Sequence, residues 1–174
     1  GKFSENSRFE GDVKNRDNTS YSINYQPFIG ITINTKWGIT GNIRSNRSVT
    51  FDYRAAGATS KREQGGFSLN ASYSVTRGFN LPIPFMKNKK LKNEIQFQMA
   101  FDQSSSSNFT RQNAQSSFEE LDVTDNWKLR PSITYRFSQR VNGTAFYEQS
   151  TASNKRTGDT SYKEFGINVN IAIR

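Results

Sequence analysis

The chain has 174 residues, of which 33% are hydrophobic and 13% aromatic, and its formal net charge is +9. Mean hydropathy is −0.80, which is low for a soluble globule, while the aromatic content argues against disorder. Cysteine and histidine are both absent. This excludes disulfides and thiolate metal sites and removes the commonest general base. We therefore expect no enzyme activity, no bound metal and no cofactor.

Two further absences concern targeting and membrane helices. The longest apolar run is Leu81–Met86, far short of the roughly 18 residues that a spanning helix needs. No signal peptide opens the chain, as expected of a mature form or of a piece of something larger. The one compact basic cluster, Lys87–Lys90, is more typical of a solvated loop than of a nucleic-acid site. We expect no nucleic-acid partner.

In chain order, residues 1–20 are predicted to be an N-terminal loop or partial strand. Within them Phe9, Gly11 and Val13 alternate with charged residues. Residues 21–174 read as antiparallel strands joined by polar loops, because apolar and polar side chains alternate with a period of two. The predicted strands are residues 21–35, 39–53, 67–75, 93–102, 123–137, a segment from 141 and the closing segment 165–173.

Short and long connections alternate along the predicted sheet. Lys36–Gly38 and Ser138–Arg140 read as tight turns, whereas Ala55–Gly66, Gln103–Asp122 and Asn154–Thr160 read as long polar loops. The connection over residues 77–92 is apolar and contains two prolines, so it cannot belong to an interior ladder. It is expected to be a packed rim loop, or a partner-binding loop through Phe79, Leu81, Ile83, Phe85 and Met86.

The fold predicted from these patterns is all-β, an antiparallel transmembrane β-barrel wall of about seven or eight strands that forms part of a much larger barrel. Long strands, aromatic residues at strand ends and the rhythm of hairpins favour a barrel over a soluble sandwich. The expected lipid-facing residues are Ile95, Phe97, Met99, Phe101, Phe165, Ile167, Val169, Ile171 and Ile173. The expected lumen-facing residues are Asn42, Arg44, Asn46, Glu94, Gln96, Gln98, Arg130, Arg136, Asn168 and Asn170.

Three stretches of the sequence resemble the SprA family, the outer-membrane translocons of the type 9 secretion system. They are the hairpin over residues 26–50, the segment Leu81–Asn93 and the closing Val169–Ile173. The resemblance implies a portion of a large barrel that exports folded proteins and supports gliding motility in Bacteroidetes-type bacteria. It also implies a lipid membrane, secreted cargo, a smaller outer-membrane barrel and a periplasmic plug as partners. The implied location is the bacterial outer membrane, with the C-terminus periplasmic and the long loops extracellular. The terminal Ile-Arg departs from the aromatic residue that usually ends outer-membrane barrels.

Two other functions remain compatible with the pattern. A self-contained barrel of eight strands would have a structural, adhesion or binding role. A secreted sandwich that binds polyanions would instead be soluble. Strand number discriminates the first from a wall section, because seven strands cannot close as an even-numbered antiparallel barrel.

Overall fold

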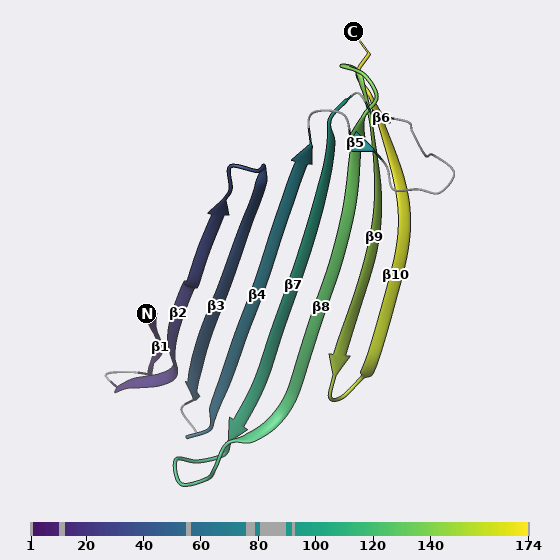
Figure 1. The fold of residues 1–174 in the computed structure, drawn as a ribbon. Coiled ribbons are helices and arrows are strands. Elements are labelled where there is room, and N and C mark those ends of the chain that lie inside the picture. The colour runs from purple at the N-terminus through teal and green to yellow at the C-terminus, as the bar shows by residue number, and fades with distance from the viewer. Residues whose placement is uncertain are drawn as a thin grey trace.

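The computed structural model describes residues 2–10, 13–54, 57–75, 79–80, 90–91 and 93–173. These residues form an all-β fold built on one antiparallel sheet in the order β1-β2-β3-β4-β7-β8-β9-β10 (Figure 1). The strands are β1 Lys2–Glu10, β2 Val13–Asn34, β3 Ile39–Arg54, β4 Thr59–Val75, β7 Ile95–Arg111, β8 Glu119–Arg136, β9 Val141–Asn154 and β10 Gly158–Ile171. Every strand is hydrogen-bonded to its neighbour in sequence, with β7 following β4 across one longer connection.

The register gives the whole sheet two consistent faces. From β2 to β10 the ladder pairs odd residues with odd, as in the row Ile39, Tyr73, Phe97, Ile133, Ala145 and Ile167. Directly paired residues lie on the same face of a sheet. The alternation seen along each segment is therefore in phase across seven strands. The pairing of β7 with β8 departs from this odd-with-odd pattern only beyond Asn108 of β7, where the register shifts.

The strands extend well beyond the predicted segments, so the predicted long loops are wrong in length. β4 begins at Thr59, β7 continues to Arg111 and β8 begins at Glu119. The turn between β9 and β10 covers only residues 155–157. These extensions have polar residues on both faces and lack an apolar alternation, but their backbone groups are paired in the ladder. Backbone pairing does not need an apolar face.

Of the two alternatives predicted for residues 1–20, a loop or a partial strand, the described residues 2–10 and 13–20 form strand. β1 pairs with the first part of β2, from Val13 to Ser22. The alternating segment around Phe9 and Val13 is divided between the two strands, and Gly11 lies outside the described residues. The pairing of β2 with β3 shifts between Tyr25 and Ile29, inside the strand predicted over residues 21–35.

The connection between β4 and β7 contains a pair of two-residue strands, β5 Phe79–Asn80 and β6 Lys90–Leu91. Of the predicted partner-loop residues, Leu81, Ile83, Phe85 and Met86 lie outside the described residues, and only the backbone of Phe79 is described. The partner-loop prediction therefore remains a prediction.

A single layer of sheet leaves this chain with almost no interior. Its accessible surface is 13104 Å², whereas a compact monomer of 19.8 kDa would expose about 8,600 Å². Only Ile95 and Phe146 are buried among the described hydrophobic residues. Packing between layers, which stabilises most domains, is not available within the described chain. No helix among the described residues is long and apolar enough to cross a membrane.

Neighbouring strands compensate locally by packing an aromatic ring onto a glycine. Phe146 of β9 is directly paired with Gly166 of β10. A Cβ added to Gly166 would lie 2.4 Å from the Phe146 ring. The missing side chain of Gly166 thus makes the space that the ring fills, and Phe146 is only 9% exposed.

This contact predicts that Gly166→Val destabilises the fold by about 1–3 kcal/mol, because the ring must leave its position. Gly65→Ala is the matched control, since a Cβ there meets nothing closer than 4.0 Å. The midpoint of denaturant unfolding should fall for the first variant and hold for the second. Combining Gly166→Val with Phe146→Ala should recover part of the loss; an unchanged midpoint for Gly166→Val would contradict the packing.

Candidate functional site: two faces of one sheet

One face of the sheet carries a continuous band of apolar side chains. We call this the apolar band: the odd-numbered residues of Ile29–Ile33, Ile39–Ile43, Phe67–Val75, Ile95–Phe101, Trp127–Tyr135, Val141–Tyr147 and Phe165–Ile173. All nine residues predicted to face lipid belong to it. Many of its members are largely exposed, including Phe165 at 69% and Ile167 at 66%. Ile95, which was predicted to face lipid, is an exception, since it is only 2% exposed; no second layer of the described chain covers the rest of this surface.

The apolar band ends abruptly while the strands continue. On the same face, Lys61 and Glu63 follow the band on β4, and Asp125 and Lys163 follow it on β8 and β10. The band is therefore about seven to nine residues long on five of its strands, or roughly 23–30 Å at 3.3 Å per residue. It lies toward the end of the sheet that carries the turns at residues 35–38 and 137–140, which we call the turn rim.

The apolar band runs obliquely to the rows of paired residues. We use the row of paired residues from Ile39 to Ile167 as a reference line. On β3 the centre of the band is Gly41, which is two residues farther from the turn rim than Ile39, the member of that row. On β10 the centre is Val169, two residues toward that rim. The centre thus moves four residues in five strand-to-strand steps. With a rise of 3.3 Å per residue and a strand spacing of 4.8 Å, each strand is inclined by about 30° to the perpendicular of the band. Figure 1 shows the matching stagger, since β2 and β3 end well short of β8 to β10.

Aromatic side chains border the apolar band. At the turn rim Trp37 is 81% exposed, and the rings of Tyr135 and Phe137 meet edge to face at 4.9 Å. At the other border, Phe67 and Trp127 are both in register with Gln103 of β7. Aromatic side chains are favoured where apolar and polar surroundings meet, because they combine a large apolar body with polar edges.

The opposite face is polar and concave. A hollow of about 960 Å³ extends from β2 to β10, and its wall includes Arg44, Asn46, Asp102, Lys128 and Tyr162. A second hollow of about 610 Å³ lies nearer the turn rim, against Asn42, Asn70, Gln98, Ser132 and Thr144. Most residues that line these two hollows are even-numbered, and the first hollow extends across seven strands, so we take the polar face as the concave side of the sheet and the apolar band as its convex side. A third and smaller hollow, of about 410 Å³, is lined mainly by odd-numbered residues of β3, β4 and β7.

The ten residues predicted to face a lumen all carry even numbers and belong to this polar face or its continuation. Gln96 and Gln98 are paired with Thr134 and Ser132, and Asn168 is paired with Thr144. Glu94 lies just before β7 and forms an ion pair with Arg136 at 3.5 Å. The sequence-based assignment of residues to two faces thus agrees with the register; it does not by itself identify what each face contacts.

Hydrogen bonds connect polar side chains across neighbouring strands of this face. The hydroxyls of Thr40 and Ser72 are 2.6 Å apart, and those of Thr134 and Thr144 are 2.9 Å apart. The Asn170 amide donates to the Asn142 carbonyl oxygen at 3.1 Å. Such pairs add modest stability to each strand pairing, and their polar groups keep this face hydrophilic.

The densest charged group on the polar face surrounds Glu148, whose side chain is 13% exposed. Its carboxylate is 2.8 Å from the Lys128 ammonium and 3.6 Å from the Arg130 guanidinium. The Arg130 guanidinium also lies over the Phe146 ring, 4.5 Å from its centroid. The sequence analysis did not assign Phe146, since a lone aromatic among polar residues carries no signal until its pairing with Gly166 is known.

A separate aromatic cluster lies on the convex face beyond the apolar band. The Lys61 ammonium is 5.2–5.9 Å from the ring centroids of Phe51, Phe109 and Phe118, and it is also ion-paired with Glu63. Arg111 lies over Phe118 at 4.8 Å. Because Phe118 belongs to the connection between β7 and β8, these contacts hold that connection against the sheet.

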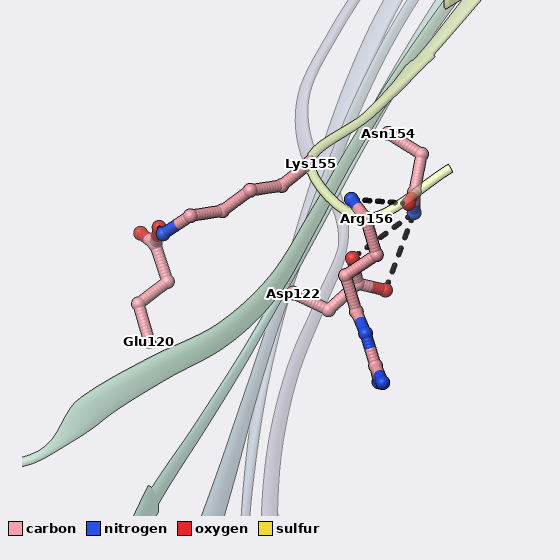
Figure 2. A network of polar contacts seen from close by, with 5 residues as sticks. All are labelled: Glu120, Asp122, Asn154, Lys155 and Arg156. Carbon is pink, nitrogen blue, oxygen red and sulfur yellow. Dashed lines mark hydrogen bonds and ion pairs between the residues drawn. The ribbon is translucent and has the colours of Figure 1, made fainter. Parts of the chain in front are cut away.

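The turn between β9 and β10 is fastened to β8 by a polar network (Figure 2). The Asn154 amide donates to Asp122 at 3.1 Å and to the Thr124 hydroxyl at 2.7 Å. The side-chain carbonyl oxygen of Asn154 accepts hydrogen bonds from the backbone N–H groups of Arg156 and Thr157, both at 2.9 Å. Asn154 therefore satisfies the turn and joins it to the neighbouring strand.

No group of three or more acidic residues that could hold a metal ion occurs in the part of the chain that the structure describes. No model of a known protein family matches the chain, and no characterised protein in the comparison does. The functional argument therefore depends on the two faces of the sheet.

The network predicts that Asn154→Ala lowers the free energy of unfolding by about 1–3 kcal/mol, because Asp122 and two turn amides lose their partner. Hydrogen exchange at Arg156 and Thr157 should accelerate. Lys155→Ala is the control: its ion pair with Glu120, 2.7 Å long, is between side chains that are 55% and 40% exposed. Such a pair contributes less than about 1 kcal/mol. Equal effects of the two variants would contradict this assignment.

Proposed function

We propose that this chain is a wall section of a transmembrane β-barrel, with the apolar band in contact with lipid and the polar face around an aqueous path. The observation that carries the proposal is the sense of curvature. A water-soluble sheet buries its apolar face against another layer of the same fold. Here the apolar side chains lie on the convex face and the polar ones line the hollow.

The dimensions of the apolar band support the same proposal. Transmembrane barrels have an apolar outer band about 25 Å tall and strands tilted by roughly 35–45°. Strands of nine band residues crossing at about 30° would span about 26 Å. Backbone groups in lipid must be paired, and within the band the described ladder supplies that pairing between β2 and β10.

The edges of the sheet favour a section of a larger wall over a complete small barrel. β1 covers only Val13–Ser22, so the Ile23–Asn34 edge of β2 has no partner strand among the described residues. The outer edge of β10 has none either. β2 and β10 run in the same direction, since six antiparallel steps separate them. Antiparallel closure would therefore need an odd number of strands between them. β1 is one such strand and brings the sheet to eight, but it is not paired with β10 and leaves Ile23–Asn34 of β2 uncovered.

A protein-conducting translocon of the type 9 secretion system is the function we propose for the complete barrel. Its support is the resemblance of three segments to the SprA family, together with a sheet that remains open after seven strands have crossed the band. In this proposal the protein lies in the bacterial outer membrane, the turn rim and C-terminus are periplasmic, and the other end is extracellular. Its partners would be further strands of the barrel, a smaller outer-membrane barrel, a periplasmic plug and secreted cargo.

Placing a charge in the apolar band tests the membrane assignment. Val169→Arg should cost about 2–4 kcal/mol of folding free energy in a bilayer, because Val169 lies at the centre of the band. Its neighbour Asn168 lies on the other face, so Asn168→Arg is the matched control and should be tolerated. The measurement is the folded fraction in lipid vesicles. Equal tolerance of both variants would exclude lipid contact at Val169.

Electrical recording of the protein in planar bilayers tests the conducting role. A wide aqueous path should give large conductance steps, whereas an eight-stranded barrel filled by side chains should give none. Arg130→Glu should shift the ion selectivity toward cations, since it reverses a charge on the proposed path. The control is Asp125→Lys, which also changes a charge but lies beyond the band on the convex face, so it should leave the ion selectivity unchanged. A charge within the band, as in Val169→Lys, would not be a suitable control because it affects insertion. Insertion without conductance would favour the small barrel.

A further inference from the structure

In the sequence, basic residues outnumber acidic ones in the segments that begin or end strands on the side of the turn rim. Of 24 basic and 15 acidic residues, nine basic ones and one acidic one belong to these segments. The acidic one is Glu94, and the nine are Lys36, Arg77, Lys87, Lys89, Lys90, Lys92, Arg136, Arg140 and Arg174, of which Arg77, Lys87, Lys89, Lys92 and Arg174 lie outside the described residues. The remaining fifteen basic and fourteen acidic residues of the sequence almost cancel.

The described members of this group are held at the border of the apolar band. Lys36 and Arg140 occupy the turns after β2 and β8 and are exposed. The first turn is closed by the Thr35 N–H and the Ile39 carbonyl at 2.8 Å, and the Arg140 carbonyl accepts the Ala172 N–H at 2.9 Å. Neither Lys36 nor Arg140 has an ion-pair partner among the described residues. Both are therefore positioned by backbone contacts with their charges uncompensated.

Exposed aromatic side chains accompany these charges. Trp37 is 81% exposed and adjoins Lys36, while Phe137 is 57% exposed and lies three residues before Arg140. An aromatic ring with a flanking cation is the pattern expected at the headgroup level of a membrane. Basic side chains there extend from the apolar border toward lipid phosphates.

We propose that the turn rim binds the anionic headgroups of the lipid leaflet that surrounds it, through Lys36 and Arg140 beside Trp37 and Phe137. This inference rests on the proposed membrane function. Both borders of the apolar band carry aromatic side chains, and at the turn rim Lys36 and Arg140 lie beside them without an ion-pair partner among the described residues, so we assign the selectivity to the turn rim. Anionic lipid would hold the barrel at a defined depth and orientation.

The two tryptophans of the chain allow a direct test, because they lie at opposite borders of the apolar band. In Trp127→Phe protein, Trp37 is the sole tryptophan at the turn rim; in Trp37→Phe protein, Trp127 reports on the other border. Each is reconstituted into phosphatidylcholine vesicles containing phosphatidylglycerol, with either lipid carrying brominated chains that quench fluorescence. The relative affinity of phosphatidylglycerol at each border follows from the quenching.

Brominated phosphatidylglycerol should be preferred at Trp37 by about fivefold or more, and Lys36→Gln with Arg140→Gln should reduce the preference to about unity. Trp127 should show no preference, and Lys155→Gln with Arg156→Gln should not change the result at Trp37. Added salt should weaken the preference at Trp37.

Two failures are distinguishable. If both lipids quench Trp37 equally, the rim has no anionic selectivity, and the membrane assignment still holds. If neither lipid quenches either tryptophan, the chain does not contact lipid and both proposals fall. A preference that persists in the Lys36→Gln, Arg140→Gln variant would overturn the assignment to these two side chains.

Discussion

The backbone ladder is the constraint on which every other feature depends. Packing contributes little, since only Ile95 and Phe146 are buried hydrophobic residues among those described. Hydrogen bonds between strands instead keep seven strands in one phase, and a slip of one residue would exchange the two faces of a strand. Cross-strand contacts such as Phe146 with Gly166 and Thr134 with Thr144 reinforce that phase.

A sheet of this kind is incomplete in water. Its convex apolar band has no covering layer, and the edges of β2 and β10 have no described partner. Lipid can cover the band, because hydrocarbon requires no complementary shape, while further strands can pair the edges. The tilt, the height and the curvature are separate consequences of the fold, and each is compatible with the same environment.

The charged side chains differ in their pairing between the polar face and the turn rim. The polar face balances its charges locally, as Glu148 does with Lys128 and Arg130. At the turn rim Arg136 is paired with Glu94, whereas Lys36 and Arg140 have no ion-pair partner among the described residues and lie beside exposed aromatic rings.

The sequence alone determined the class of secondary structure, the approximate positions of the strands and which residues share a face, because the side-chain period of a strand is two. The strand ends at Thr59 and Arg111 were decided only in three dimensions, since polar extensions are paired through their backbone and carry no hydrophobic pattern. The contact of Phe146 with Gly166 and the concave curvature of the polar face also required the fold. The same holds for the oblique course of the band and for the position of Lys36 and Arg140 on one rim of the sheet. These depend on the register between strands, which no single strand's sequence specifies.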